Sequence, residues 1–314
     1  MATIYGPFAG VNATETFGPV LLALSYWALY AHRCRTLADE DRPVPGWRRA
    51  CFAGGLLVFV IALVPPIGTL SQQLLVAHMV EHLLIGDIAS LLVVLGLTGP
   101  LLVPLLRVRA LSRLRVLTHP VVAIVCWGVN FYAWHWPAAY TLALRNDWVH
   151  AVEHATFFIF GSCVWMALLG PLPKPAWFTN SARLVYIIAV RLVGTVLANI
   201  LIFGGTVFYP YYRPGDAYWH VSPLADQVYA GAVMMVEESI LTILLFAWLF
   251  MKVAGETEQR QELLDYAGTH GIALSEQRAS RAVAAGRSEE LWERLRGSDA
   301  ADPEPHSTAS APGP

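Results

Sequence analysis

Residues 72–97 read QQLLVAHMVEHLLIGDIASLLVVLGL, and this stretch decides the class of fold. Glu81 and Asp87 are its only formally charged residues, and it contains no proline. A helix that crosses a bilayer needs about 20 mostly apolar residues, so the stretch predicts a membrane-spanning helix. Its two histidines and two acids are costly in lipid, which makes them candidates for a functional role.

Six further stretches have the length and apolar character of a span. The complete set of predicted spans is 16–33, 50–69, 72–97, 118–135, 148–170, 182–204 and 226–251. Pro65-Pro66 shortens the second of them. The segment 99–117 is apolar at first and basic later, which is typical of an interfacial or re-entrant helix. The sequence therefore predicts an all-α, polytopic membrane helix bundle with seven spans.

The composition of the whole chain agrees with a membrane protein. The 314 residues are 56% hydrophobic and 14% charged, with a mean hydropathy of +0.49. Soluble domains carry about 25% charged residues, so this composition excludes a disordered, fibrous or ordinary soluble protein. The hydrophobic bilayer is thus the first predicted partner, and neither half of the chain is basic enough for nucleic acid.

Charge divides the chain into two parts. Residues 1–252 carry 15 Lys and Arg against 12 Asp and Glu, whereas residues 253–314 carry 6 against 11. We therefore predict a membrane domain over 1–252 and a small cytoplasmic helical tail over 253–297. The end, 298–314, is rich in Pro, Ala, Ser and Asp, a composition typical of disorder.

Basic residues in the loops predict the orientation. The first, third and fifth loops hold 11 Lys and Arg together, and the alternate loops hold 2. Because cytoplasmic loops are enriched in Lys and Arg, the N-terminus is predicted outside and the C-terminus in the cytoplasm. The four cysteines show no CxxC spacing, which argues against a thiol copper relay.

Two copies of the pattern H-x-x-E-H stand near the starts of the third and fifth spans. They are His78, Glu81 and His82, and then His150, Glu153 and His154. Residues three and four apart share one face of a helix, so each copy forms a patch of two imidazoles and a carboxylate. His135 closes the fourth span, and Met234 and Met235 lie in the seventh; the predicted orientation puts all of these in the outer half of the membrane.

A single histidine in a span is more often a hydrogen-bonded packing residue, and a methionine pair alone is more often part of the core. Two same-face pairs with a fifth histidine at one depth instead favour a metal site. Imidazole suits Zn, Cu and Fe, and thioether favours Cu(I). Glu81 and Glu153 either hold the imidazoles in orientation or ligate, which would favour zinc or iron. Haem bound by two histidines remains an alternative.

Further charges lie deep in the predicted spans. Arg191 and Glu238 fall at similar depths in the sixth and seventh spans. Because charges in lipid usually survive by pairing, we predict a buried Arg191–Glu238 pair, with Asp87 as the alternative partner.

Several ordered stretches resemble the polytopic CtaG family of bacterial cytochrome c oxidase assembly proteins. They are AHMVEHLLIGDIASLLVVLGLTGP (77–100), HP (119–120), WHWPAAYTLALRNDWVHAVEHATFFIFG (134–161) and DQVYAGAVMM (226–235). The resemblance covers about residues 16–252. Glu81, where we expect glutamine more often, and the acidic stretch 236–239 depart from the family pattern.

The resemblance implies a multi-pass protein of the bacterial plasma membrane that assembles a haem–copper oxidase and is not an enzyme. It implies oxidase subunits as partners and copper delivery as the favoured mechanism. The family's histidine positions match here at His78, His82, His135, His150 and His154. The carried-over motif also includes Trp134, Pro137, Tyr140, Glu153, Asp226 and Gln227.

Other function classes use similar residues. H-x-x-E-H is also a zinc-protease pattern, and paired histidine helices occur in membrane di-iron enzymes. The protease signature normally occurs once, and two copies weaken that interpretation. A copper permease is a further alternative, although few ligand residues continue inward from the histidines. The sequence makes no prediction about the oligomeric state.

Overall fold

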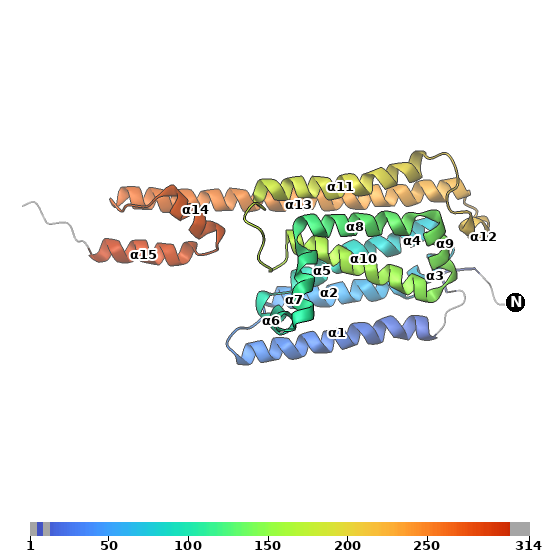
Figure 1. The fold of residues 1–314 in the computed structure, drawn as a ribbon, viewed down its shortest axis with the longest axis horizontal. Coiled ribbons are helices and arrows are strands. Elements are labelled where there is room, and N and C mark those ends of the chain that lie inside the picture. Colours follow the sequence, from blue (N-terminus) through green and yellow to red (C-terminus); the bar gives the residue numbers. More distant parts are fainter. Residues whose placement is uncertain (1–4, 9–12, 302–314) are drawn as a thin grey trace, which may run out of the picture. The chain divides into compact units, whose positions relative to one another are not determined.

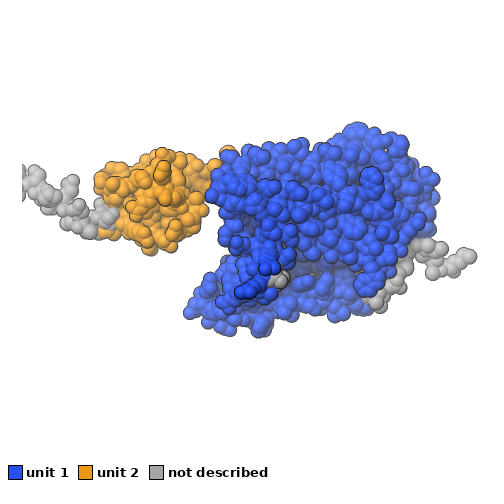
Figure 2. Space-filling model, in the orientation of Figure 1, with its two compact units in different colours: residues 1–242 blue, residues 243–314 orange. Residues whose placement is uncertain are grey.

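The computed structural model describes residues 5–8 and 13–301, and within them all regular secondary structure is helical (Figure 1). This confirms the all-α prediction. The chain divides into two compact units, residues 1–242 and 243–314 (Figure 2). The division falls inside the longest helix, α13 (Pro223–Thr269), and so does the boundary predicted at 252.

The first unit is built from long helices joined by short ones. The long elements are α1 (Ala13–Asp39), α2 (Gly46–Leu63), α4 (Leu75–Leu83) with η1 (Leu84–Ala89) and α5 (Ser90–Gly96), α8 (Pro120–His135), α10 (Asp147–Leu168), α11 (Asn180–Phe203) and the start of α13. The short elements are α3 (Ile67–Leu70), α6 (Gly99–Arg107), α7 (Arg109–Leu114), η2 (Arg115–Thr118), α9 (Pro137–Arg145), η3 (Pro210–Tyr212) and α12 (Arg213–Tyr218).

Five helices in the described part of the chain are long and apolar enough to cross a membrane. They are 46–70, 75–96, 147–168, 180–203 and 223–269. A sixth results if Ser112–Thr118 and Pro120–His135, which meet at a bend of 77°, form one span. The seven spans predicted from the sequence are thus not confirmed. The predicted span 16–33 lies in α1, which is not among these helices.

The segment predicted as interfacial, 99–117, forms the three short elements α6, α7 and η2. None of the three alone has the length of a span. Pro104 lies inside α6, and arginines follow it. The segment thus connects α5 to α8, with α6 in contact with α1 and η2 in contact with α10.

The continuous rod of α4, η1 and α5 lies at the centre of the first unit, between α2 and α10 (Figure 1). Its middle part, η1, is a π-helix. Gly161 of α10 lets the two backbones approach closely, because a Cβ atom there would lie 2.0 Å from the carbonyl oxygen of Gly86. Short π-helical turns such as η1 within an α-helix are often found at functional sites.

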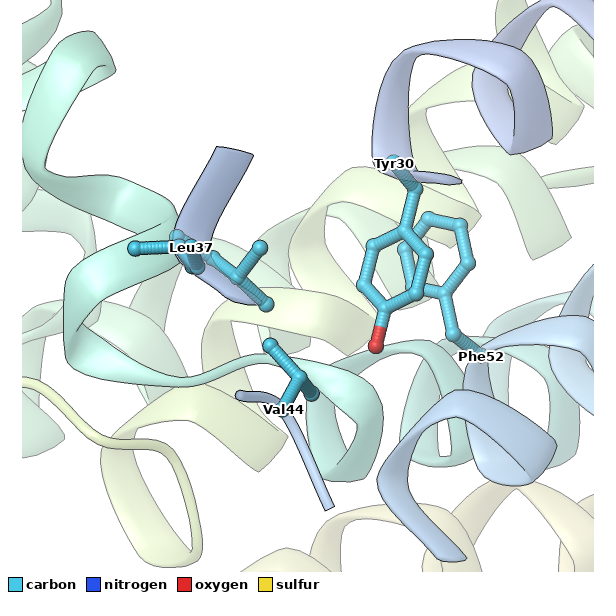
Figure 3. Packing of buried hydrophobic residues seen from close by; sticks show 5 residues of the cluster. Tyr30, Leu37, Val44 and Phe52 are labelled. Carbon is cyan, nitrogen blue, oxygen red and sulfur yellow. The ribbon is translucent and has the colours of Figure 1, made fainter. Parts of the chain in front are cut away.

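One end of α1 is attached to the bundle by a buried apolar cluster. Tyr30, Leu37, Val44 and Phe52 pack together there (Figure 3). The rings of Tyr30 and Phe52 are stacked with centroids 3.8 Å apart. Arg48 donates hydrogen bonds to the carbonyl groups of Leu95 and Leu97, at the end of α5.

The second unit has its own small core. It contains the end of α13 with α14 (Glu276–Ala284) and α15 (Ser288–Ala301), packed around Leu263, Val283, Leu291 and Leu295. These helices occupy the region where a helical tail is predicted. Most of the predicted disordered end 298–314 lies outside the described residues, which stop at 301.

Candidate metal centre

The two H-x-x-E-H segments face each other on α4 and α10. The rings of His78 and His150 are stacked with centroids 5.4 Å apart, and those of His82 and His154 are 5.5 Å apart. Each segment lies on one helical face, as its spacing predicts, and the two faces meet between α4 and α10. We call His78, Glu81, His82, His150, Glu153 and His154 the histidine–glutamate cage.

Each glutamate of the cage reaches the histidines of the opposite helix. A carboxylate oxygen of Glu153 lies 3.7 Å from Nε2 of His82, and one of Glu81 lies 3.7 Å from Nε2 of His154. Glu153 also lies 4.0 Å from Nε2 of His150 on its own helix. The glutamate of each helix therefore lies next to a histidine of the other helix.

The donor atoms of the cage are close enough to share a metal ion. One group consists of His78, His82, His150 and Glu153, and a second of Glu81, His150 and His154; within each group the donor atoms lie within 4.8 Å of one another. The cage is buried, and His150 has the most exposed side chain among its ion-paired members, at 15%. It is thus a compact set of imidazoles and carboxylates away from water.

Several cage atoms have no hydrogen-bond partner within the described residues. They include both ring nitrogens of His78 and of His82, Nε2 of His150 and of His154, and both carboxylate oxygens of Glu153. Buried polar atoms are nearly always hydrogen-bonded, so a cluster of unpartnered ones needs an explanation. A bound metal ion would satisfy these lone pairs, and the donor set fits one.

Helix caps fix the first turns of both cage helices. The carboxylate of Asp226, on α13, accepts hydrogen bonds from the backbone N–H groups of Leu75 (2.6 Å) and Val76 (3.0 Å) at the start of α4. The side chain of Asn146 accepts from Trp148 (3.1 Å) and Val149 (3.2 Å) at the start of α10. Both caps satisfy backbone donors that a helix leaves free at its N-terminus.

Three tyrosines cover the cage next to these first turns. The hydroxyl of Tyr140 lies 2.9 Å from that of Tyr212, which donates to the carbonyl of Ser71 at 3.3 Å. Tyr209 donates to the carbonyl of His135 at 2.6 Å. Burial raises the pKa of Tyr209 and Tyr212, so both hydroxyls remain protonated donors.

His135 and Met234 lie beside the cage rather than in it. The ring of His135 is 6.2 Å from that of His82, and His135 does not belong to either donor group. Both line a small cavity together with His82 and Asp87. The sulfur of Met235 lies elsewhere, 3.9 Å from the amide nitrogen of Asn199.

The ionic pair in the spans joins Arg191 to Glu238. The guanidinium donates to the Glu238 carboxylate and, at 2.9 Å, to the hydroxyl of Ser239. Gly194 leaves space for this carboxylate, because a Cβ atom at position 194 would lie 1.5 Å from Oε1 of Glu238. Asp87 instead lines the cavity beside His82.

Sequence reasoning brought the four cage histidines together but missed the covering residues. Tyr209, Tyr212 and Ser71 carry no motif, and only the aromatic cluster around 209–219 marks this loop in the sequence. Tyr140 and Asp226 are named by the family resemblance, without a role. The structure gives each a partner: Tyr212 for Tyr140, and the start of α4 for Asp226.

Comparison with known proteins identifies the family. The family model described as cytochrome c oxidase caa3 assembly factor matches residues 26–256, which include all of the cage. No curated protein and no solved structure matches the chain. The chain belongs to the cytochrome c oxidase caa3 assembly factor family.

Proposed function

We propose that this member of the caa3 assembly factor family binds copper as Cu(I) in the histidine–glutamate cage and delivers it to a haem–copper oxidase. The family membership supports the assembly role. The cage supports the binding of a metal, since its donor atoms are grouped within 4.8 Å of one another. In this role the protein handles the ion as cargo and is not an enzyme.

The unpartnered imidazole nitrogens of His78 and His82 are the observation that carries the proposal. Neutral imidazole is a good ligand for copper, and four such rings in a buried site offer it more donors than it needs. An ion in a low-dielectric interior also requires a counter-charge, which Glu153 supplies next to three of the rings. Excess donors allow the ion to exchange ligands without leaving the protein.

We further propose the topology that this delivery requires. Seven spans, with the N-terminus outside and the C-terminus in the cytoplasm of a bacterial cell, put the cage in the outer half of the plasma membrane. In this topology α1 and the bent pair of η2 and α8 each count as a span. The cage then lies at a depth from which an ion can pass laterally to a membrane-embedded oxidase subunit.

One observation favours a second candidate function. Glu153 lies in a single donor group with three histidines, and a carboxylate among imidazoles suits zinc or iron better than Cu(I). A membrane metalloenzyme with one of these ions would use the same residues. Identification of the metal that the cage retains separates the two functions.

The assembly role is tested in cells that lack the gene. Complementation with the native protein should restore the copper content and activity of the haem–copper oxidase in isolated membranes. His78→Ala and His150→Ala should each fail to restore them at normal protein levels, because each removes a ring from the donor groups. His32→Ala, at an exposed position on α1, is the matched control. Full restoration by both cage variants would contradict the proposal.

A further inference from the structure

We propose that Cu(I) has a second binding position beside the cage, formed by His82, His135 and Met234, through which it leaves the cage. This inference rests on the proposed copper-binding function and adds a path to it. The second position shares His82 with the cage. It lies between α4, η1, α8, α10 and α13, whose residues line one small cavity.

The hydrogen bonding of His135 leaves one nitrogen available for a metal. Nδ1 lies 2.7 Å from the carbonyl oxygen of Phe131, which requires that this nitrogen carry the proton and donate it. Nε2 then bears the lone pair, and it is buried without a hydrogen-bond partner in the described part of the chain. A backbone carbonyl that holds the other ring nitrogen is the usual support of a metal-ligating histidine.

The cavity has room for a single small ligand. Its volume is about 20 Å³, and His82, His135, Met234 and Asp87 are among the residues that line it. That volume is enough for one water molecule or one metal ion. Met234 is 2% exposed and His135 is 5% exposed, so the donors are shielded from solvent.

The donors around the cavity fit Cu(I) better than a hard cation. Two neutral imidazoles and a thioether form a soft ligand set, and thioether sulfur selects for Cu(I). Asp87 also lines the cavity, and a carboxylate there would provide the counter-charge that a cation needs away from water. Asp87 lies in the π-helix η1, which follows α4 directly.

His82 connects the two positions. Its ring centroid lies 4.3 Å from that of His78 on the cage side and 6.2 Å from that of His135 on the cavity side. The ion moves by releasing cage ligands as it gains Nε2 of His135 and the sulfur of Met234, and it keeps its charge and oxidation state. Because two cations this close would repel each other, one ion is shared between the two positions.

The test is copper X-ray absorption on the full-length protein, purified in detergent and loaded anaerobically with one equivalent of Cu(I). Copper content is measured first, because a protein that retains no copper refutes the proposed function itself. In loaded native protein we expect a sulfur contribution of less than one per copper. Met234→Leu should remove the sulfur contribution, whereas Met235→Leu, the matched control, should leave it unchanged.

Two further variants keep the test decisive if Met234→Leu is poorly folded. His150→Ala, which weakens the cage only, should raise the sulfur contribution of the copper still bound towards one. His135→Asn keeps a donor for the Phe131 carbonyl and removes Nε2, so it should lower the sulfur contribution at unchanged copper content. Copper without any sulfur contribution in both native protein and His150→Ala would overturn the second position and leave copper binding by the cage intact.

Discussion

The cap that Asp226 provides to α4 couples the first turn of α13 to the histidine–glutamate cage. Asp226→Ala removes the acceptor of two backbone N–H groups, those of Leu75 and Val76, and Leu75 is buried. A hydrogen bond to a charged group contributes about 1.5–3 kcal/mol, and loss of a helix cap costs about 0.5–2 kcal/mol. Since water reaches part of the opened turn, we expect a total loss of about 2–4 kcal/mol.

Thermal unfolding of the purified protein in detergent measures this loss. At about 2–4 °C per kcal/mol for a domain of this size, the melting temperature should fall by about 5–15 °C. Copper retention should also weaken, because His78 lies one turn after the released N–H groups. Asp226→Asn keeps one acceptor oxygen and should lose about half as much.

Asp147→Ala is the matched control, because Asp147 is an exposed acid in the first turn of the other cage helix. Its interaction with the helix dipole is lost, about 0.3–1 kcal/mol, together with the charge interaction between Asp147 and His150. Equal melting temperatures for Asp226→Ala and Asp147→Ala would refute the role of Asp226 as a cap. Normal melting with lost copper would instead show that Asp226 acts on the metal directly.

Further predictions concern other parts of the chain. Arg191→Leu leaves the Glu238 carboxylate unpaired, which should cost about 3–5 kcal/mol and lower the amount of protein in the membrane; replacement of both residues by Leu should restore it. Burial, with a neighbouring carboxylate, raises the pKa of Asp216 to about 7. The folded protein therefore favours the protonated carboxyl, and the stability that this form contributes is lost as the pH rises through that value. Asp216→Asn should therefore raise the melting temperature at about pH 8.5 more than at about pH 5.5, and an equal effect at both would refute this. Removal of residues 257–314, which lie beyond the family match, should leave oxidase assembly intact; a later cut would expose Leu263. Loss of assembled oxidase at normal levels of the truncated protein would contradict the prediction that residues 257–314 are dispensable.

The helical class and the pairing of the two histidine segments were predictable from local pattern. Spacing of three and four residues puts His78, Glu81 and His82 on one face whatever the surroundings. That α4 packs against α10 is a tertiary fact, but two matching polar faces in lipid have few other ways to avoid hydrocarbon. The cage is therefore the part of the site that the sequence specifies most directly.

The separation of His135 and Met234 from the cage was not predictable. Depth in the membrane places them at the level of His82, but the direction of each side chain depends on how α8 and α13 are rotated. The π-helix after His82 is also invisible in an apolar run such as 84–89, because it changes the hydrogen-bond register and not the composition. The structure groups the four cage histidines with Glu81 and Glu153, and it places His135 and Met234 on a neighbouring cavity; the ligand set itself stays a prediction.

The number of spans is the other point at which sequence and structure differ. The stretch 16–33 is rich in apolar residues, yet its proline, its aromatic residues with polar groups, and His32 and Arg33 at its end lower the mean hydropathy. Its helix is held to α2 through the Tyr30 and Phe52 rings at one end. In the described part of the chain, five helices, or six with the bent pair, are long and apolar enough to cross a membrane, and α1 is not among them.

The central claim is that the histidine–glutamate cage holds copper. The most direct test is metal analysis with an optical spectrum of the detergent-purified protein, beside the double variant His78→Ala/His150→Ala. We predict copper near one equivalent, no Soret band, and a large loss of copper in the variant at unchanged protein yield. A Soret band, or zinc or iron retained in place of copper, would contradict the claim, as would equal copper in both proteins.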